Sequence, residues 1–298
     1  MKFENIAVYN FDNAFRGMRN PKNSWHLSDS AFGITHLDNV DAIADDVAAA
    51  WVEFLYPGEL PNSYTSLLEE KHEWLIKNGI IFVEDDYCVY AFIGPKDMKL
   101  AQGLIKGGSE HRKFMRQIFV SVDITAPLYW WKEFDTYKVG TVANSTSTMH
   151  KMAAKPITLD CFDTDDIVSL FDVDNELTST MEGFDANDYG VSFDDADSAP
   201  IEFLAFLEDL RLKYLATKDK RYWKELIRWL PESWLQTRTV TMDYENLLAM
   251  CSRGQRRFHK LNEWSGQDDK TLPNFISMAR ELPYAQELIF LDELVQEH

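Results

Sequence analysis

A cluster of cationic side chains at the end of a predicted helix is the strongest candidate for a binding site. Asp243 has the residue type of an N-cap for a helix over 244–252, and Arg253 follows at its far end. The cluster then continues with Arg256, Arg257, His259 and Lys260. Planar guanidinium groups bind phosphates and the carbonyls of flat rings through paired hydrogen bonds. We therefore expect a small anion to bind here, although the helix dipole alone also explains a cation at a helix end.

The overall charge limits which anion this can be. The chain has 298 residues and a formal net charge of −19, which excludes a general nucleic-acid-binding surface, because such surfaces need clustered Lys and Arg. The segment 157–200 contains many carboxylates and neither Lys nor Arg. It is predicted to be an acidic, loop-rich insertion within a single domain spanning 1–298. A local positive site for a small molecule remains compatible with this distribution.

The sequence also predicts the compartment. No apolar run is long enough to suggest a membrane span, and the first residues lack the pattern of a secretory signal. Cys88, Cys161 and Cys251 are scattered, which favours neither a disulfide framework nor a structural metal site. We expect a cytoplasmic protein without a bound metal or a membrane contact.

Periodicity and turn residues predict the elements that position these side chains. Residues 118–124 alternate as a strand that ends at Ala126-Pro127, and 237–241 is a second, β-branched strand. Two short strands surround an acidic turn at Asp85-Asp86, Gly79 is a candidate helix C-cap, and 141–148 is a polar loop. Helices are expected over 41–55, 63–78, 97–106, 128–137, 203–218, 221–230 and much of 272–297. The predicted class is α+β, with an antiparallel or mixed sheet flanked by helices.

The second half of the chain resembles a motif of the flavin-dependent thymidylate synthases. Those enzymes carry Leu-Pro, then Thr-x-Asn at a strand end, an Arg ten residues later, and His-Ala-Gln-x-Glu. This chain has Leu230-Pro231, Thr241-Met242-Asp243, Arg253, and His259 to Glu263 as His-Lys-Leu-Asn-Glu. The spacing from Asp243 to Arg253 is that of the family, whereas His259 comes two residues later.

An earlier segment resembles the family's other motif in its context. The family has Arg-His-Arg and then Ser-x-Asn-Glu-x-Ser-x-Arg-Tyr after an Ala-Pro that ends a strand. Here Ala126-Pro127 is followed by Thr136-Tyr137-Lys138 and then by TVANSTSTMH over 141–150. Without a gap, Thr148 replaces the nucleotide-binding Arg, while a shift of one residue instead matches Asn144 and Ser147 to the family's Asn and Ser.

The resemblance implies a function and assigns roles. A member of this family binds FAD, uses NADPH and methylenetetrahydrofolate, converts dUMP to dTMP by reductive methylation, and is a homotetramer. By resemblance, Arg253 would be the catalytic residue that activates the pyrimidine. The nucleotide would be held by Arg253, Arg228, Thr146 and Ser147, and the flavin by Lys138, Asn144, Asp243 and His259.

Other interpretations stay open at this point. One keeps the fold without synthase activity, as a nucleotide-binding or pyrimidine-modifying protein, including one of phage origin. Another is an acidic interaction protein whose 157–200 insertion contacts a basic partner. A calcium loop at 185–196 is disfavoured because position 12 is Ala196, where a carboxylate is needed.

Overall fold

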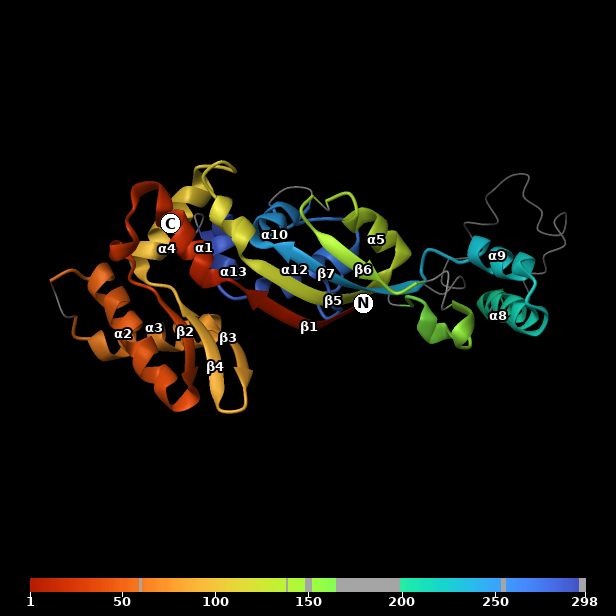
Figure 1. Ribbon diagram of the computed structural model, residues 1–298, viewed down its shortest axis with the longest axis horizontal. Helices are drawn as coiled ribbons and strands as arrows, with labels where there is room; N and C mark the ends of the chain where they lie inside the picture. The colour runs from red at the N-terminus through yellow and green to blue at the C-terminus, as the bar shows by residue number, and fades with distance from the viewer. Residues whose placement is uncertain (59–60, 138, 148–151, 165–198, 253–255, 295–298) are drawn as a thin grey trace, which may run out of the picture. The chain divides into compact units, whose positions relative to one another are not determined.

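The computed structural model describes residues 1–58, 61–137, 139–147, 152–164, 199–252 and 256–294 (Figure 1). The chain forms two compact units. The first comprises Met1–Ile124, Glu133–Asn144 and Arg238–His298, and the second comprises Thr125–Lys132 and Ser145–Thr237. Helices and sheets are mixed, as the α+β prediction requires. Within the described residues, no helix combines the length and apolar character of a bilayer span.

The first unit contains an antiparallel three-stranded sheet covered by two helices (Figure 1). Its strands are β2 (Ala31–His36), β4 (Tyr87–Phe92) and β3 (Ile80–Glu84), in that order. The helices α2 (Leu37–Leu55) and α3 (Tyr64–Gly79) pack against the sheet through a buried apolar cluster. The predicted strand pair around Asp85-Asp86 is confirmed, and α2 begins four residues before the predicted start.

Gly79 has a different role from the predicted C-cap. It is the last residue of α3, the C-cap is Ile80, and Gly79 is not among the residues with positive φ. A Cβ at position 79 would lie 2.5 Å from the Phe92 ring, 2.8 Å from the Ala91 carbonyl oxygen and 2.8 Å from the Tyr284 hydroxyl. Gly79 is therefore required by the close approach of neighbouring atoms and not by backbone conformation.

A four-stranded sheet, in the order β1-β5-β7-β6, carries the segments that contain the candidate site. Its strands are β1 (Lys2–Tyr9), β5 (Phe119–Pro127), β7 (Leu235–Asp243) and β6 (Val142–Ser145). The predicted alternation in β5 is confirmed, because Val120, Val122 and Ile124 are fully buried and their neighbours are not. The polar loop predicted over 141–148 is corrected in part, since 142–145 forms the strand β6. Pairing with a neighbouring strand satisfies its backbone, so low side-chain hydrophobicity does not prevent strand formation.

Both predicted strand-to-helix junctions are present. The strand β5 ends at Pro127 and α5 (Leu128–Phe134) follows at once, although this helix ends three residues before the predicted end. The strand β7 ends at Asp243, and α10 (Tyr244–Met250) follows. The chain's last segment forms the short helices α11 (Asn262–Ser265), α12 (Phe275–Arg280), α13 (Ala285–Leu288) and α14 (Leu291–Leu294).

Two helices pack together in the second unit. The helices α8 (Ala199–Thr217) and α9 (Lys220–Arg228) pack together over a small apolar cluster that includes Leu207, Leu210 and Leu226. The apolar spacing in 203–218 predicts Phe203 and Phe206 on the buried stripe of this helix, but both are exposed. Most of the predicted acidic insertion, 165–198, lies outside the described residues.

The remaining helices of the first unit are α1 (Phe11–Arg19) and α4 (Pro95–Lys106). A buried ion pair joins them, because Arg19 Nε donates to Asp97 Oδ1 at 2.5 Å. The hydroxyls of Ser28 and Ser30 donate to the other carboxylate oxygen of Asp97. The charge is thus buried with its hydrogen bonds satisfied, which is the condition under which a buried pair is tolerated.

Candidate functional site

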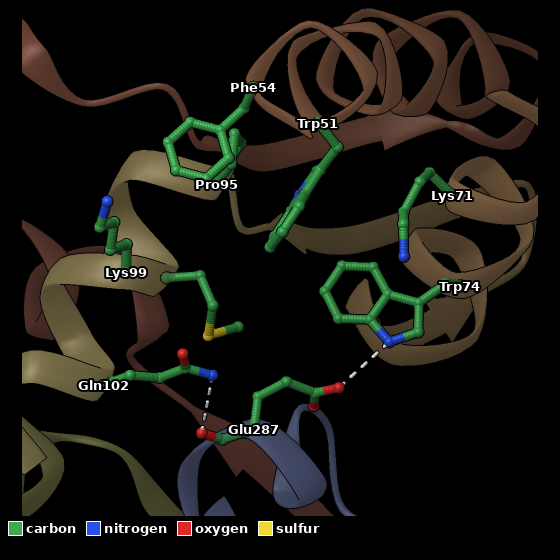
Figure 2. Close-up of a pocket in the computed structure, with 9 residues that line it drawn as sticks. Trp51, Phe54, Lys71, Trp74, Pro95, Lys99, Gln102 and Glu287 are labelled. Carbon is green, nitrogen blue, oxygen red and sulfur yellow. Dashed lines mark hydrogen bonds between the residues drawn. The ribbon is translucent and has the colours of Figure 1, made fainter. Parts of the chain in front are cut away.

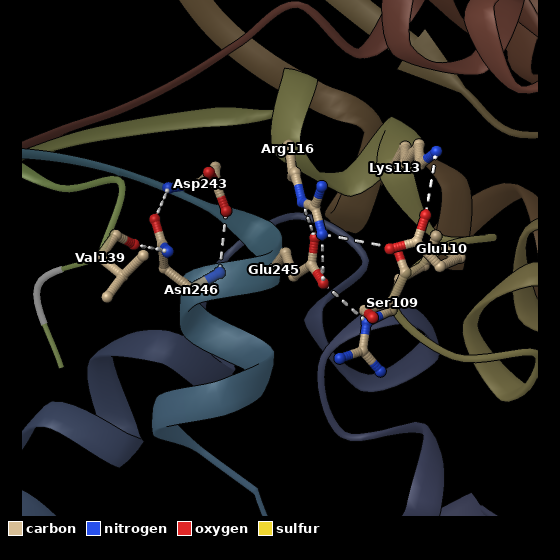
Figure 3. Close-up of polar contacts among 9 residues, drawn as sticks. Ser109, Glu110, Lys113, Arg116, Val139, Asp243, Glu245 and Asn246 are labelled. Carbon is tan, nitrogen blue, oxygen red and sulfur yellow. Dashed lines mark hydrogen bonds and ion pairs between the residues drawn. The ribbon is translucent and has the colours of Figure 1, made fainter.

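The N-terminus of α10 contacts the loop that follows α5. Asp243 accepts a hydrogen bond from the Asn246 backbone at 2.8 Å, and the Asn246 side chain accepts one from the Asp243 backbone at 3.1 Å, which forms a capping box. The Asn246 side chain also donates to the Val139 carbonyl at 2.6 Å (Figure 3). Gly140 has φ 85°, a conformation that favours glycine. The loop after α5 is therefore attached to the junction between β7 and α10.

Asp243 is largely buried, which changes its acidity. Burial raises the pKa of the Asp243 carboxyl above its ordinary value, and hydrogen bonds from the backbone of Asn246 and Glu245 offset part of this effect. The predicted N-cap is confirmed. Its expected contact with a flavin stays a prediction.

A second group of contacts joins α5 to the segment after α10. Glu133 Oε1 accepts a hydrogen bond from the Tyr137 hydroxyl at 2.8 Å and lies 3.3 Å from His259 Nε2. The other imidazole nitrogen, Nδ1, accepts a hydrogen bond from the Leu261 backbone at 3.1 Å. Because Nδ1 is an acceptor, this geometry places the imidazole proton on Nε2, directed at Glu133. Glu133 thus orients both His259 and Tyr137.

Aromatic rings and a guanidinium complete this group. The Arg256 guanidinium carbon lies 4.2 Å from the centroid of the Tyr137 ring. Trp264 packs edge-on against Tyr137, with ring centroids 5.5 Å apart, and 5.6 Å from His259. Arg256 Nη1 donates to the Ala249 carbonyl at 2.8 Å, and its other nitrogens donate to no described residue. Arg256 is therefore held in place while part of its donor set stays available to an anion.

The predicted cationic cluster separates into residues with different roles. Arg257 is 5% exposed and donates to Cys251 O, to both carboxylate oxygens of Asp292 and to Glu293. It joins the C-terminal helices to the chain and has no place at a ligand site. Lys260 is exposed, and Arg256 and His259 remain beside Tyr137.

Sequence reasoning did not find a charged cluster next to the capping box. Glu245, in the first turn of α10, accepts hydrogen bonds from Arg112 at 3.1 Å and from Arg116, whose Nη2 also reaches Ser109 O (Figure 3). The only signal available in the sequence is the spacing of the two arginines. Their partner is more than a hundred residues away, so only the fold brings the three side chains together.

Three of the predicted nucleotide-binding residues, Thr146, Ser147 and Arg228, belong to the second unit. Arg228 is exposed in the last turn of α9 and forms an ion pair with Glu225 at 2.9 Å. The Thr146 backbone donates to Thr237 O at 2.9 Å, and its carbonyl accepts from the Gln236 side chain at 3.1 Å. Ser147 follows directly. Asn144, from the flavin group, is exposed on β6 in the first unit.

Arg253, Lys138 and Thr148 lie outside the described residues, so their predicted roles are untested. The structure does bring together parts of the two segments that carry the resemblance. Glu133, Tyr137 and Val139 of the first segment contact His259, Arg256 and Asn246 of the second, respectively. A half-buried cation, an imidazole and aromatic rings in contact can bind a flat anionic molecule.

Comparison with known proteins found similarities among solved structures. No protein-family model and no curated protein matches the chain. Among solved structures, the chain is similar to two of flavin-dependent thymidylate synthase from Helicobacter pylori with FAD and dUMP. Their identities are 13% and 14%, both TM-scores are 0.40, and the matches cover 88% and 89% of this chain and 98% of each of those chains.

A UMP/dUMP methylase from Streptomyces cacaoi, bound with 5-Br UMP, is similar at 14% identity and a TM-score of 0.35. That match covers 53% of this chain and 65% of the methylase chain.

Proposed function

We propose that this chain binds a pyrimidine nucleotide and FAD in the manner of the flavin-dependent thymidylate synthases. The proposed site includes residues 135–137 and 139–141, the start of α10 and the segment 256–264. In its full form the proposal is the reductive methylation of dUMP to dTMP, with NADPH and methylenetetrahydrofolate as co-substrates and a homotetramer as the assembly.

One observation supports this proposal most. Arg256 lies over Tyr137 and is bound by Ala249 O through Nη1 alone within the described residues. In a chain of net charge −19, a half-buried guanidinium with spare donors is a specific place for a phosphate. Tyr137 stands in the middle of the sequence triplet that resembles the family's Arg-His-Arg, so the anion site and the motif coincide.

The residues around Arg256 fit a flavin dinucleotide by the chemistry of their side chains. Arg256 and Lys260 offer positive charge for a pyrophosphate, and Tyr137 and His259, which are both partly exposed, offer flat rings beside it. When bound, a flavin supplies hydride chemistry. The protein's part is to bind and orient, and here Glu133 fixes the rings of Tyr137 and His259.

A second candidate keeps the nucleotide site without synthase activity. It is favoured by Tyr137, whose hydroxyl is committed to Glu133 at the position where the family has an imidazole. By this interpretation the chain binds or modifies another pyrimidine nucleotide, and purified protein lacks bound flavin.

Absorbance and calorimetry test the first proposal. Purified protein should absorb at about 450 nm if FAD is bound, and dUMP should bind in isothermal titration. Arg256→Gln should weaken dUMP or FAD binding by about tenfold or more, since one charged hydrogen bond is lost. Arg221→Gln, on the exposed surface of α9, is the matched control. Equal binding by the two variants would remove Arg256 from the site.

Activity is measured separately. The conversion of dUMP to dTMP with FAD, NADPH and methylenetetrahydrofolate can be followed by chromatography, and growth of a thymidine-requiring bacterium gives an independent readout. Binding of dUMP without turnover in either assay favours the second candidate.

A further inference from the structure

The C-terminal helices α13 and α14 are attached to the core of the first unit. Trp74 Nε1, on α3, donates to Glu287 Oε1 at 3.2 Å, and the Gln102 side chain, on α4, reaches the Glu287 carbonyl at 3.5 Å (Figure 2). The Tyr284 hydroxyl, just before α13, donates to a carbonyl of β4 at 2.7 Å. Phe290, between the two helices, is fully buried. The helix α14 therefore follows a packed and hydrogen-bonded base.

Two carboxylates of α14 bind Arg257, the residue next to Arg256 in the chain. Arg257 Nη1 and Nη2 donate to the two carboxylate oxygens of Asp292 at 3.0 Å and 2.8 Å, and Nη1 also donates to Glu293 Oε1 at 2.8 Å. Its Nε donates to the Cys251 carbonyl at 2.8 Å. Paired hydrogen bonds of this kind fix both the position and the plane of a guanidinium.

The main chain beside Arg257 is held to the end of α10. The Arg257 N–H donates to Ser252 O at 3.1 Å, and Arg256 Nη1 donates to Ala249 O at 2.8 Å. Consecutive Cα atoms are a fixed distance of about 3.8 Å apart, so a chain that is fixed at Arg257 restricts where Arg256 can lie. From this position the Arg256 guanidinium reaches the ring of Tyr137.

The carboxylates of α14 also decide which positive charge a ligand meets. Asp292 and Glu293 neutralise Arg257, which is 5% exposed. Arg256 forms no ion pair with a carboxylate within the described segments and is only partly buried. An anion that approaches this segment is therefore attracted to Arg256, while Arg257 stays committed to α14.

We propose that Asp292 and Glu293 act through Arg257 as positioning residues for Arg256, so that the C-terminal helix α14 sets the affinity of the anion site. This inference rests on the proposed function, because it concerns the same site. Groups that hold a binding residue in its productive geometry reduce the ordering cost of binding. The coupling is reciprocal, so a ligand bound at Arg256 should in turn slow the opening of α14.

Hydrogen exchange of the full chain tests the coupling without a ligand. Asp292→Asn removes one of the charges that hold Arg257, so the amides of 256–264 should exchange about tenfold or more faster, while those of β2 and β4 keep their rates. Asp292→Glu keeps the carboxylate and should restore slow exchange. Arg280→Gln is the matched control, because it removes two hydrogen bonds to Glu293, of 2.7 Å and 2.8 Å, and leaves the Asp292 pair in place.

Two results of the exchange measurement would overturn the proposal. One is unchanged exchange of 256–264 in Asp292→Asn. The other is an equal acceleration in β2 and β4, which would show that the variant only lowers the stability of the whole unit.

Titration with dUMP and FAD measures the consequence for the site. Asp292→Asn should weaken binding of the ligand that contacts Arg256 by about tenfold, and Arg280→Gln should leave it unchanged. Unchanged binding by Asp292→Asn contradicts a positioning role, and so does tighter binding, which would mean that the released Arg257 joins the site as a second cation. If the native protein binds neither dUMP nor FAD, the proposed function fails, and hydrogen exchange alone decides whether α14 positions the Arg256 segment.

Discussion

Arg256 lies 4.2 Å above the ring of Tyr137, although 119 positions separate the two residues in the chain. Tyr137 is also oriented by Glu133 through its hydroxyl. This contact joins the loop after α5 to the segment 256–260 after α10. It holds the Arg256 guanidinium against an aromatic face, while Nε and Nη2 keep hydrogen-bond donors that no described residue accepts.

The aromatic ring of Tyr137 should contribute more to dUMP or FAD binding than its hydroxyl does. Tyr137→Phe keeps the cation–aromatic contact, whereas Tyr137→Leu removes it, at a cost of about 0.5–1 kcal/mol in the position of Arg256. We expect Tyr137→Leu to weaken dUMP or FAD binding several-fold and Tyr137→Phe to change it little. Calorimetry on the two variants compares them directly, and equal losses would place the effect in the hydroxyl.

Asp243→Asn should make the protein less sensitive to pH. Asn keeps the acceptor for the Asn246 backbone but cannot ionise. Because burial raises the folded-state pKa of Asp243, the native protein loses stability as pH rises from the unfolded-state pKa of about 3.9 through that raised value. The variant lacks this loss, so its Tm relative to the native protein should rise over that window and stay constant above it.

Thermal unfolding at several pH values measures this difference. A variant that is less stable than the native protein by the same amount at low and at neutral pH would show that the carboxylate has no desolvation penalty in the folded state. The same variant introduces the Asn of the motif that this segment resembles, so dUMP binding by the proposed site should be retained.

Two helical glycines should respond to Ala in opposite directions. Gly79→Ala places a Cβ against Phe92, Ala91 O and the Tyr284 hydroxyl and should destabilise the fold by about 1–3 kcal/mol. Gly103, inside α4, has open space around the same position, so Gly103→Ala should stabilise by up to about 1 kcal/mol. Chemical denaturation of both variants gives the comparison. Destabilisation by Gly103→Ala, or none by Gly79→Ala, would contradict the packing described.

The buried ion pair between Arg19 and Asp97 should contribute far more to the free energy of unfolding than an exposed ion pair does. Asp97→Asn leaves the Arg19 guanidinium buried beside a neutral amide and should cost about 3–5 kcal/mol. Asp209→Asn breaks the exposed pair with Lys213 and should cost less than about 1 kcal/mol. Urea unfolding distinguishes the two, and similar midpoints would mean that Asp97 is not buried as described.

The sequence by itself determined the local elements and their junctions. The alternation in β5, the stop at Pro127 and the Asp243 cap depend on neighbouring residues, so they could be predicted from short windows. The tertiary structure decided which of the cationic side chains are available to bind an anion. Arg257 is bound by Asp292 and Glu293, while Arg256 rests on Tyr137. Arg256 and Arg257 are adjacent in a turn after α10, and the surrounding fold decides which groups each side chain contacts. For the same reason, Gly79 was predicted as a helix C-cap from its neighbours in the sequence, whereas the structure shows that contacts from distant residues require a glycine there.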